Sequence, residues 1–193
     1  MGKKPLTEAQ VERVRKLTEG KELHSLLLNL SVDLMLRSSD LLALRVGDVI
    51  SGKQIRDEVV VKQKKTGKFS IPLPLSSHSK AVIREWLWGR DPKDYIFRGN
   101  KSAYTKKPIT TQQYARIVKG WMAELPVKLM KDQDISQYST HSMRKTKASI
   151  VYERTKNVEA VRMSLGHRSV AATSAYLGVD EADATALLRS IEI

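Results

Sequence analysis

Apolar side chains recur along this chain mostly at three- and four-residue spacings, the pattern of amphipathic helices. From Leu23 to Leu36 the chain is instead apolar nearly all round, which predicts a helix buried in the centre of the domain. We expect Arg37 to end this helix, and a short helix through 40–44 to follow at once. The same periodicity predicts further helices over 8–17, 79–88, 111–125, 158–165, 170–177 and 181–191.

Local signals indicate where some of these helices begin. Thr7 and Gln10 have the spacing of a capping box, in which each side chain bonds the other residue's backbone N–H. Thr140 is the expected N-cap of another helix, which carries His141 and Arg144 in its first turns. This pair would therefore lie at a positively polarised helix N-terminus.

Two stretches, 54–62 and 68–75, have the composition of β-strands and are separated by a turn over 64–67 that contains two lysines. They predict a lysine-tipped β-hairpin. With the helices, this gives a mainly helical α+β fold with a small antiparallel sheet. Because no repeat, low-complexity tract or linker marks a boundary, residues 1–193 are expected to form a single domain.

The composition favours a polyanionic partner. Lys and Arg number 34 against 21 Asp and Glu, so the formal net charge is +13 and the pI is near 9.9. Nucleic acid is the first candidate, because no apolar run is long enough to span a bilayer and no signal peptide is apparent. The absence of cysteine excludes disulfides and thiolate metal sites. We therefore expect a soluble intracellular protein.

Three fragments near the end of the sequence carry groups suited to phosphodiester chemistry: a His141-x-x-Arg144 pair, a Leu-Gly-His167 turn, and Tyr176 nine residues further on. A phosphodiester under attack gathers negative charge on its non-bridging oxygens and needs fixed donors there. A tyrosine can supply the attacking oxygen once adjacent cations and hydrogen-bond donors favour the phenolate. The set therefore indicates a tyrosine nucleophile beside a phosphate-binding cluster.

Each residue also has an ordinary interpretation. The His-x-x-Arg pair could arise by chance, the histidine of the Leu-Gly-His turn could have no function, and Tyr176 could be a half-buried packing aromatic. Arg37 could form an ion pair with Asp40 or Asp48, and Lys65 could be a solvated hairpin lysine. The joint pattern, rather than any single residue, argues for function.

That joint pattern resembles the tyrosine recombinase (phage integrase) family. The resemblance rests on Arg37 in its Leu- and Asp-rich segment, on a lysine before the strand leading into Ile-Pro-Leu73, and on the three fragments above. The spacings of 23 residues from Arg144 to His167 and of nine residues from His167 to Tyr176 are also typical of the family. The resemblance implies six catalytic positions: Arg37, Lys65, His141, Arg144, His167 and Tyr176.

Three features depart from the family pattern. Met35-Leu36 stands where a glycine is usual, and Lys145 follows Arg144 where histidine is common. The lysine hairpin is one residue shorter than in many members, which leaves Lys64 as an alternative to Lys65.

The resemblance covers essentially the whole chain and implies a tyrosine-recombinase catalytic-domain fold without the usual N-terminal core-binding domain, similar in size to the fimbrial phase-variation invertases. It implies a site-specific DNA recombinase that forms a 3′-phosphotyrosyl intermediate through Tyr176 and frees a 5′-hydroxyl, with no cofactor. Arg37 and Arg144 would clamp the non-bridging oxygens, and His167 would donate to them. Lys65 would protonate the leaving oxygen, and His141 would assist deprotonation of the tyrosine or orient the phosphate.

The implied partner is double-stranded DNA. A homotetramer on paired sites is expected, weakly associating or monomeric alone, with accessory DNA-bending proteins as further candidates. We expect a cytoplasmic, nucleoid-associated protein encoded by a bacterium, phage or plasmid. No metal is expected, since the sequence shows neither a carboxylate cluster nor a His/Cys ligand set. The main alternative is a non-catalytic DNA-binding regulator that retains the fold; a relaxing topoisomerase or nicking enzyme is another.

Overall fold

The structure, a computed structural model, describes residues 3–99, 107–130 and 134–179. Two small antiparallel sheets pair β1 (Ile50–Ser51) with β2 (Gln54–Ile55), and β3 (Glu58–Val59) with β4 (Leu73–Pro74). The remaining elements are α1 (Glu8–Thr18), α2 (Glu22–Leu34), α3 (Ser38–Leu42), α4 (Val46–Val49), α5 (Ser77–Leu87), α7 (Thr111–Ala123), α8 (Val127–Met130), the 3-10 turn η1 (Ile135–Gln137), α9 (Thr140–Thr155), α10 (Val158–Leu165) and α11 (Val170–Leu177). The prediction of a mainly helical α+β fold is confirmed.

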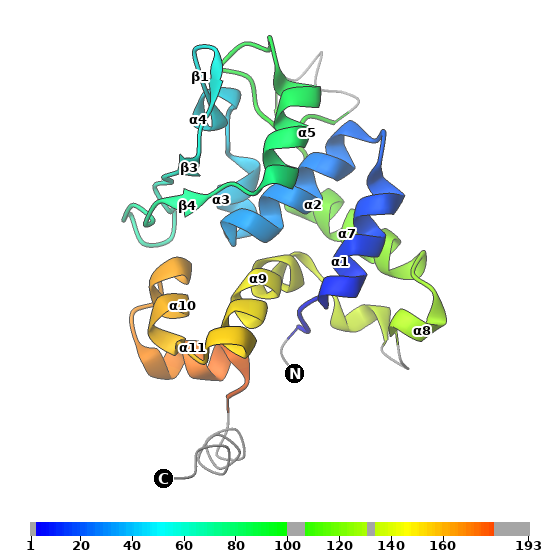
Figure 1. Cartoon of the computed structure of the whole chain (residues 1–193), viewed down its shortest axis with the longest axis vertical. Coiled ribbons are helices and arrows are strands. Elements are labelled where there is room, and N and C mark those ends of the chain that lie inside the picture. The colour runs from blue at the N-terminus through cyan, green and yellow to red at the C-terminus, as the bar shows by residue number, and fades with distance from the viewer. Residues whose placement is uncertain (1–2, 100–106, 131–133, 180–193) are drawn as a thin grey trace.

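Helix α2 lies at the centre of the molecule, as its all-round apolar sequence predicts. Leu26, Leu27, Leu28 and Leu30 have no exposed surface. The helix packs against α1, α5 and α9, with α5 above it and α9 below it in Figure 1. Because all its faces are covered, α2 is a rigid support for the residues that follow it.

The chain turns sharply between α2 and α3. Met35 adopts the left-handed conformation (φ 48°), and its N–H donates to the carbonyl of Ser31 at 3.2 Å, which closes α2. Arg37 has an extended backbone and is the N-cap residue of α3. The expectation that Arg37 ends the central helix is therefore wrong, because the left-handed residue stops the helix earlier.

The two strands expected over 54–62 and 68–75 are shorter, and the first is divided. Residues 54–55 form β2, which pairs with the preceding strand β1 across a turn at Gly52. Strand β3 pairs with β4, and an isolated bridge joins Lys62 to Phe69. Prolines lack the N–H that a continuous ladder needs, and β4 contains one of the two prolines in 68–75. The lysine-tipped hairpin itself is present, because the N–H of Gln63 donates to the carbonyl of Lys68 at 2.9 Å.

Helices α9, α10 and α11 pack against one another and form the lower part of the molecule in Figure 1. They share a small apolar cluster of Met35, Ala148, Val161 and Leu165. The N-cap of α9 is Ser139, whose hydroxyl accepts from the N–H of His141 at 3.2 Å, and not Thr140 as expected. The hydroxyl of Ser139 takes the capping bond, so Thr140 becomes the first helical residue.

Other helix ends agree with the sequence. Thr7 and Gln10 form the expected capping box of α1. Gly166 ends α10 in the left-handed conformation, at φ 65°. The helix expected over 181–191 lies outside the described residues. None of the helices in the described ranges is long and apolar enough to cross a membrane.

Candidate active site

Arg144 is the most deeply placed charge of the predicted site, with only 5% of its surface exposed. Its Nη1 donates to the carbonyl of Met35 and its Nη2 to the carbonyl of Leu165, both at 2.7 Å. Burial lowers the pKa of Arg144 and the nearby Arg37 lowers it further, while Tyr176 and the buried Asp40 act to raise it. Within the described ranges no carboxylate forms an ion pair with this guanidinium. A buried cation in this state favours an incoming anion.

Arg37 supplies a second guanidinium to the same place. It is half-buried, and its Nη1 donates to the side-chain oxygen of Gln63 at 2.7 Å. Arg37 acts electrostatically on Arg144, His167 and Tyr176, and in each case it disfavours added positive charge. Two guanidiniums therefore converge without a neutralising carboxylate bond, which is the electrostatic requirement for clamping a phosphate.

His167 and Tyr176 lie beside these arginines. The His167 Nδ1 is 3.1 Å from the hydroxyl of Thr173, and its ring meets the Tyr176 ring edge to face at a centroid distance of 5.1 Å. Partial burial, then Arg144, then Arg37 lower the pKa of His167. The imidazole is therefore biased toward its neutral form, in which one ring nitrogen donates and the other accepts.

The Tyr176 hydroxyl is buried and makes no hydrogen bond of standard geometry with the residues that the structure describes. Burial raises the pKa of Tyr176 to about 12, while Arg144 and then Arg37 act to lower it. At neutral pH the phenol is thus protonated, and attack on phosphorus would require a proton acceptor. The arginines partly offset the burial, which is the direction that a nucleophile needs.

The other two predicted residues are not gathered into this cluster. Lys65 is exposed in the hairpin turn and His141 is exposed in the first turn of α9. In the described part of the chain, neither side chain makes a hydrogen bond or ion pair with the four grouped residues. Lys64 is also exposed, so the choice between the two lysines stays open.

Three neighbours of the cluster were not assigned by sequence reasoning. Asp40 is 2% exposed and accepts from the backbone N–H of Lys64 at 3.0 Å, so it anchors the hairpin instead of forming the ion pair with Arg37 that was considered. The Lys145 ammonium lies 5.0 Å from the centroid of the Tyr176 ring. Gln63 is the third. A carboxylate inside the apolar segment of α3 was a usable signal for Asp40, while nothing local marks Gln63.

An open groove of about 380 Å³ adjoins the cluster, between the hairpin and the end of α10. Gln63, Thr66 and Phe69 line one side, and Gly166 and His167 line the other. Over the described residues, no group of three His, Asp or Glu side chains is arranged to hold a metal ion.

Replacing Gly166 with alanine should lower the free energy of unfolding by about 1–2 kcal/mol, because a Cβ is disfavoured in the left-handed conformation. It should also displace Gln63, whose Nε2 lies 2.7 Å from the position of the added Cβ. Gly178→Ala is the matched control, since Gly178 has φ +80° and nothing within 4 Å of its added Cβ. Urea unfolding of both variants measures the difference. Equal losses of unfolding free energy in the two variants would show that the contact between Gln63 and Gly166 does not contribute to stability.

A model described as the phage integrase family matches residues 4–183. The chain belongs to the phage integrase family. The family assignment inferred from the residue pattern is therefore confirmed.

One relative within the family is the probable integrase/recombinase YoeC of Bacillus subtilis (strain 168). It is 31% identical over 181 residues, which are 89% of this chain and 91% of that protein. Among solved structures, XerA recombinase matches at a TM-score of 0.72 and 18% identity, and covers 98% of this chain. XerH site-specific recombinase bound to difH, in its pre-cleavage complex, matches at a TM-score of 0.68 and 17% identity, over 95% of this chain.

These two structures establish the fold and have longer chains. This chain covers 65% of the XerA chain and 53% of the XerH chain. The fold of this integrase-family chain is that of tyrosine-recombinase catalytic domains, as the sequence predicted.

Proposed function

We propose that this protein is a site-specific DNA recombinase that cuts and rejoins DNA through a 3′-phosphotyrosyl intermediate. The observation that carries the proposal is the grouping of Arg37, Arg144 and His167 around Tyr176, whose hydroxyl is buried and whose ring meets the ring of His167. In the described part of the chain, neither guanidinium bonds a carboxylate. This arrangement places a nucleophile beside two positive charges that Asp40 offsets only through space. The family and the relative described as an integrase/recombinase support the same activity.

In the proposed reaction the Tyr176 oxygen attacks the phosphorus, and the bond from phosphorus to the 5′-oxygen breaks. Arg37 and Arg144 stabilise the charge that develops on the non-bridging oxygens, and His167 donates to the same group. The tyrosine proton passes to a base, a role proposed for His141, while Lys65 or Lys64 protonates the departing 5′-oxygen. Because the phosphotyrosyl link retains a phosphodiester, a 5′-hydroxyl from a second strand can reverse the step without a cofactor.

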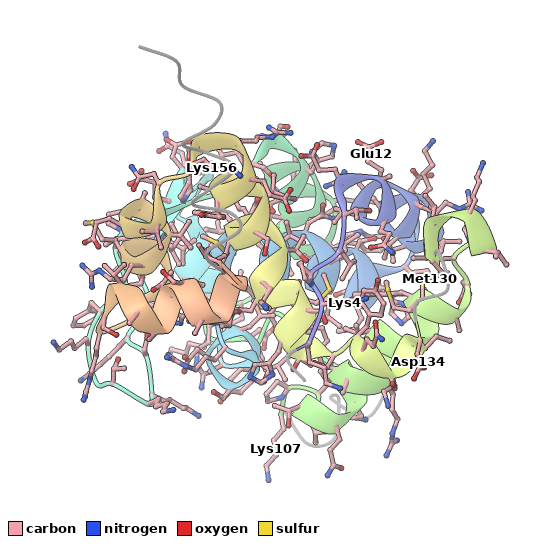
Figure 2. The ribbon with its side chains drawn as sticks, turned by 90° about the horizontal axis from the view of Figure 1, so that it is seen from below. Lys4, Glu12, Lys107, Met130, Asp134 and Lys156 are labelled. Atoms are coloured by element: carbon pink, nitrogen blue, oxygen red, sulfur yellow. The ribbon has the colours of Figure 1, made fainter. Side chains whose placement is uncertain are left out.

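Double-stranded DNA is the proposed partner. The net charge of +13 supplies the attraction, and the exposed side chain of Lys107 projects from the lower edge of the molecule in Figure 2. XerH in its solved complex is bound to the difH substrate, which supports DNA binding by the shared fold. Assembly of a homotetramer on paired sites rests on the family resemblance and stays a prediction.

The polarity of the covalent link tests the proposal. Supercoiled plasmid incubated with the protein in EDTA and quenched with SDS should yield DNA with protein on its 3′ ends. Its 5′ ends should be hydroxyls that polynucleotide kinase labels directly, and digestion from the 3′ end should be blocked. Protein on 5′ ends, or DNA binding with no covalent product, would contradict the proposal, and the second result would favour the DNA-binding regulator.

A further inference from the structure

Gln63 lies at the tip of an exposed hairpin, yet only 4% of its surface is accessible. The neighbouring residues Lys62 and Lys64 are both exposed. A buried amide is costly unless its polar atoms are bonded, so its partners define its role.

The side-chain oxygen of Gln63 accepts from Nη1 of Arg37 at 2.7 Å. The Thr66 hydroxyl lies 3.4 Å from the same oxygen, a much longer contact. A guanidinium only donates, so the oxygen and not the nitrogen of the amide must face Arg37. Gln63 thereby holds one arm of the Arg37 fork in a fixed direction.

The opposite end of the amide packs on the turn that carries His167. Its Nε2 would lie 2.7 Å, its Oε1 3.3 Å and its Cδ 3.4 Å from a Cβ at Gly166, so a side chain there would displace the amide. Gln63 is also two residues before Lys65 in the hairpin. One side chain therefore joins three segments that each bear a proposed catalytic residue.

We propose that Gln63 is a positioning residue that fixes Arg37 for phosphate binding and seats the hairpin against the turn before His167. This inference rests on the proposed function. A neutral amide suits the task, because it accepts a hydrogen bond from Arg37 without cancelling the charge that attracts the phosphate. A glutamate would keep the shape and the acceptor but would neutralise Arg37.

The test compares Gln63→Leu, Gln63→Glu and wild type in the rate of forming the SDS-stable covalent complex. The substrate is a duplex that contains the phosphate cleaved by the wild type, mapped beforehand from the trapped ends. Both variants should react about 10- to 100-fold more slowly, since misplacing a catalytic group by about 1 Å costs on this order. Gln54→Leu, at an exposed glutamine of the other hairpin, should react like wild type.

A second substrate separates positioning from a general loss of structure. When a neutral methylphosphonate replaces the cleaved phosphate, less charge develops and the direction of Arg37 contributes less. The deficits of both variants should then shrink to within about 3-fold of wild type. Gln63→Glu keeps the buried volume, so it provides the answer if Gln63→Leu fails to fold.

The outcomes separate the two proposals. If the wild type forms no covalent complex, the proposed function fails. If the wild type reacts but the variants match it, the positioning role of Gln63 is overturned and the proposed function stands. An equal deficit on both substrates overturns the role of Gln63 in fixing Arg37, and again leaves the proposed function standing.

Discussion

Replacing Tyr176 with phenylalanine should abolish the covalent complex between protein and DNA and leave the fold intact. The hydroxyl supplies the attacking oxygen, so the rate should fall by more than about 10³-fold, as when other enzymes lose their nucleophile. The substitution should cost little stability, because this buried hydroxyl has no well-formed hydrogen bond to lose among the described residues. The phenyl ring keeps its packing against His167 and Lys145. SDS gels with labelled DNA measure the reaction.

Tyr152→Phe provides the matched control. Tyr152 is half-buried on α9, and the Lys156 ammonium lies 5.3 Å from its ring centroid, much as Lys145 lies near the ring of Tyr176. Its loss of a hydroxyl should leave the covalent reaction unchanged. Persistence of the complex in the Tyr176→Phe variant would show that a different residue is the nucleophile.

The elements that the sequence predicted best are those determined by local interactions. Thr7 and Gln10 are three residues apart, and the two bonds of their capping box involve no distant residue. Gly166 likewise ends α10 because its own backbone tolerates the left-handed conformation. The central position of α2 was equally accessible, since a helix without a polar face has to be covered on all sides.

Predictions that depended on competition between neighbours were less accurate. Met35 closes α2 in a left-handed conformation, which sequence propensity does not favour for a residue with a side chain. The buried carbonyl of Met35 then accepts from Arg144, a residue 109 positions away. The predicted lengths of the hairpin strands were too great for a similar reason. Residues Gln54–Ile55 pair with β1, so they cannot extend the hairpin that contains the lysines.

The candidate site shows the same division. The motif order predicted Arg37, Arg144, His167 and Tyr176, and the structure brings these four together. The contacts that orient them come from the side chains of Gln63 and Thr173, which belong to no motif, and from the backbone carbonyls of Met35 and Leu165. Orientation depends on the tertiary structure, and therefore a single sequence names the reacting groups more readily than the residues that position them.

Replacing Arg144 with lysine should reduce the rate of covalent complex formation by about 10²- to 10³-fold, the usual cost of losing a fixed donor to a developing anion. The guanidinium reaches two carbonyls through two separate nitrogens, each at 2.7 Å. Because a guanidinium has five N–H donors, it retains others for a phosphate. A lysine ammonium is a single point and cannot reproduce this planar fork. The remaining cation should preserve DNA binding better than it preserves the reaction. Filter binding and SDS trapping on the same DNA measure the two effects.

Arg144→Ala should be worse in a second respect, because it leaves the carbonyls of Met35 and Leu165 without their donor. Each buried acceptor that loses its partner costs about 1–3 kcal/mol, so this variant should also unfold at a lower urea concentration. Arg154→Lys on the same helix is the control, since Arg154 is exposed and, among the residues described, its one ion pair is with Glu8. If Arg144→Lys reacts at the wild-type rate, the guanidinium serves only to join α2 to α10. If Arg144→Lys is stable but unreactive, the same fork that binds the two carbonyls also stabilises the phosphate, and the folded core directly orients the catalytic charge.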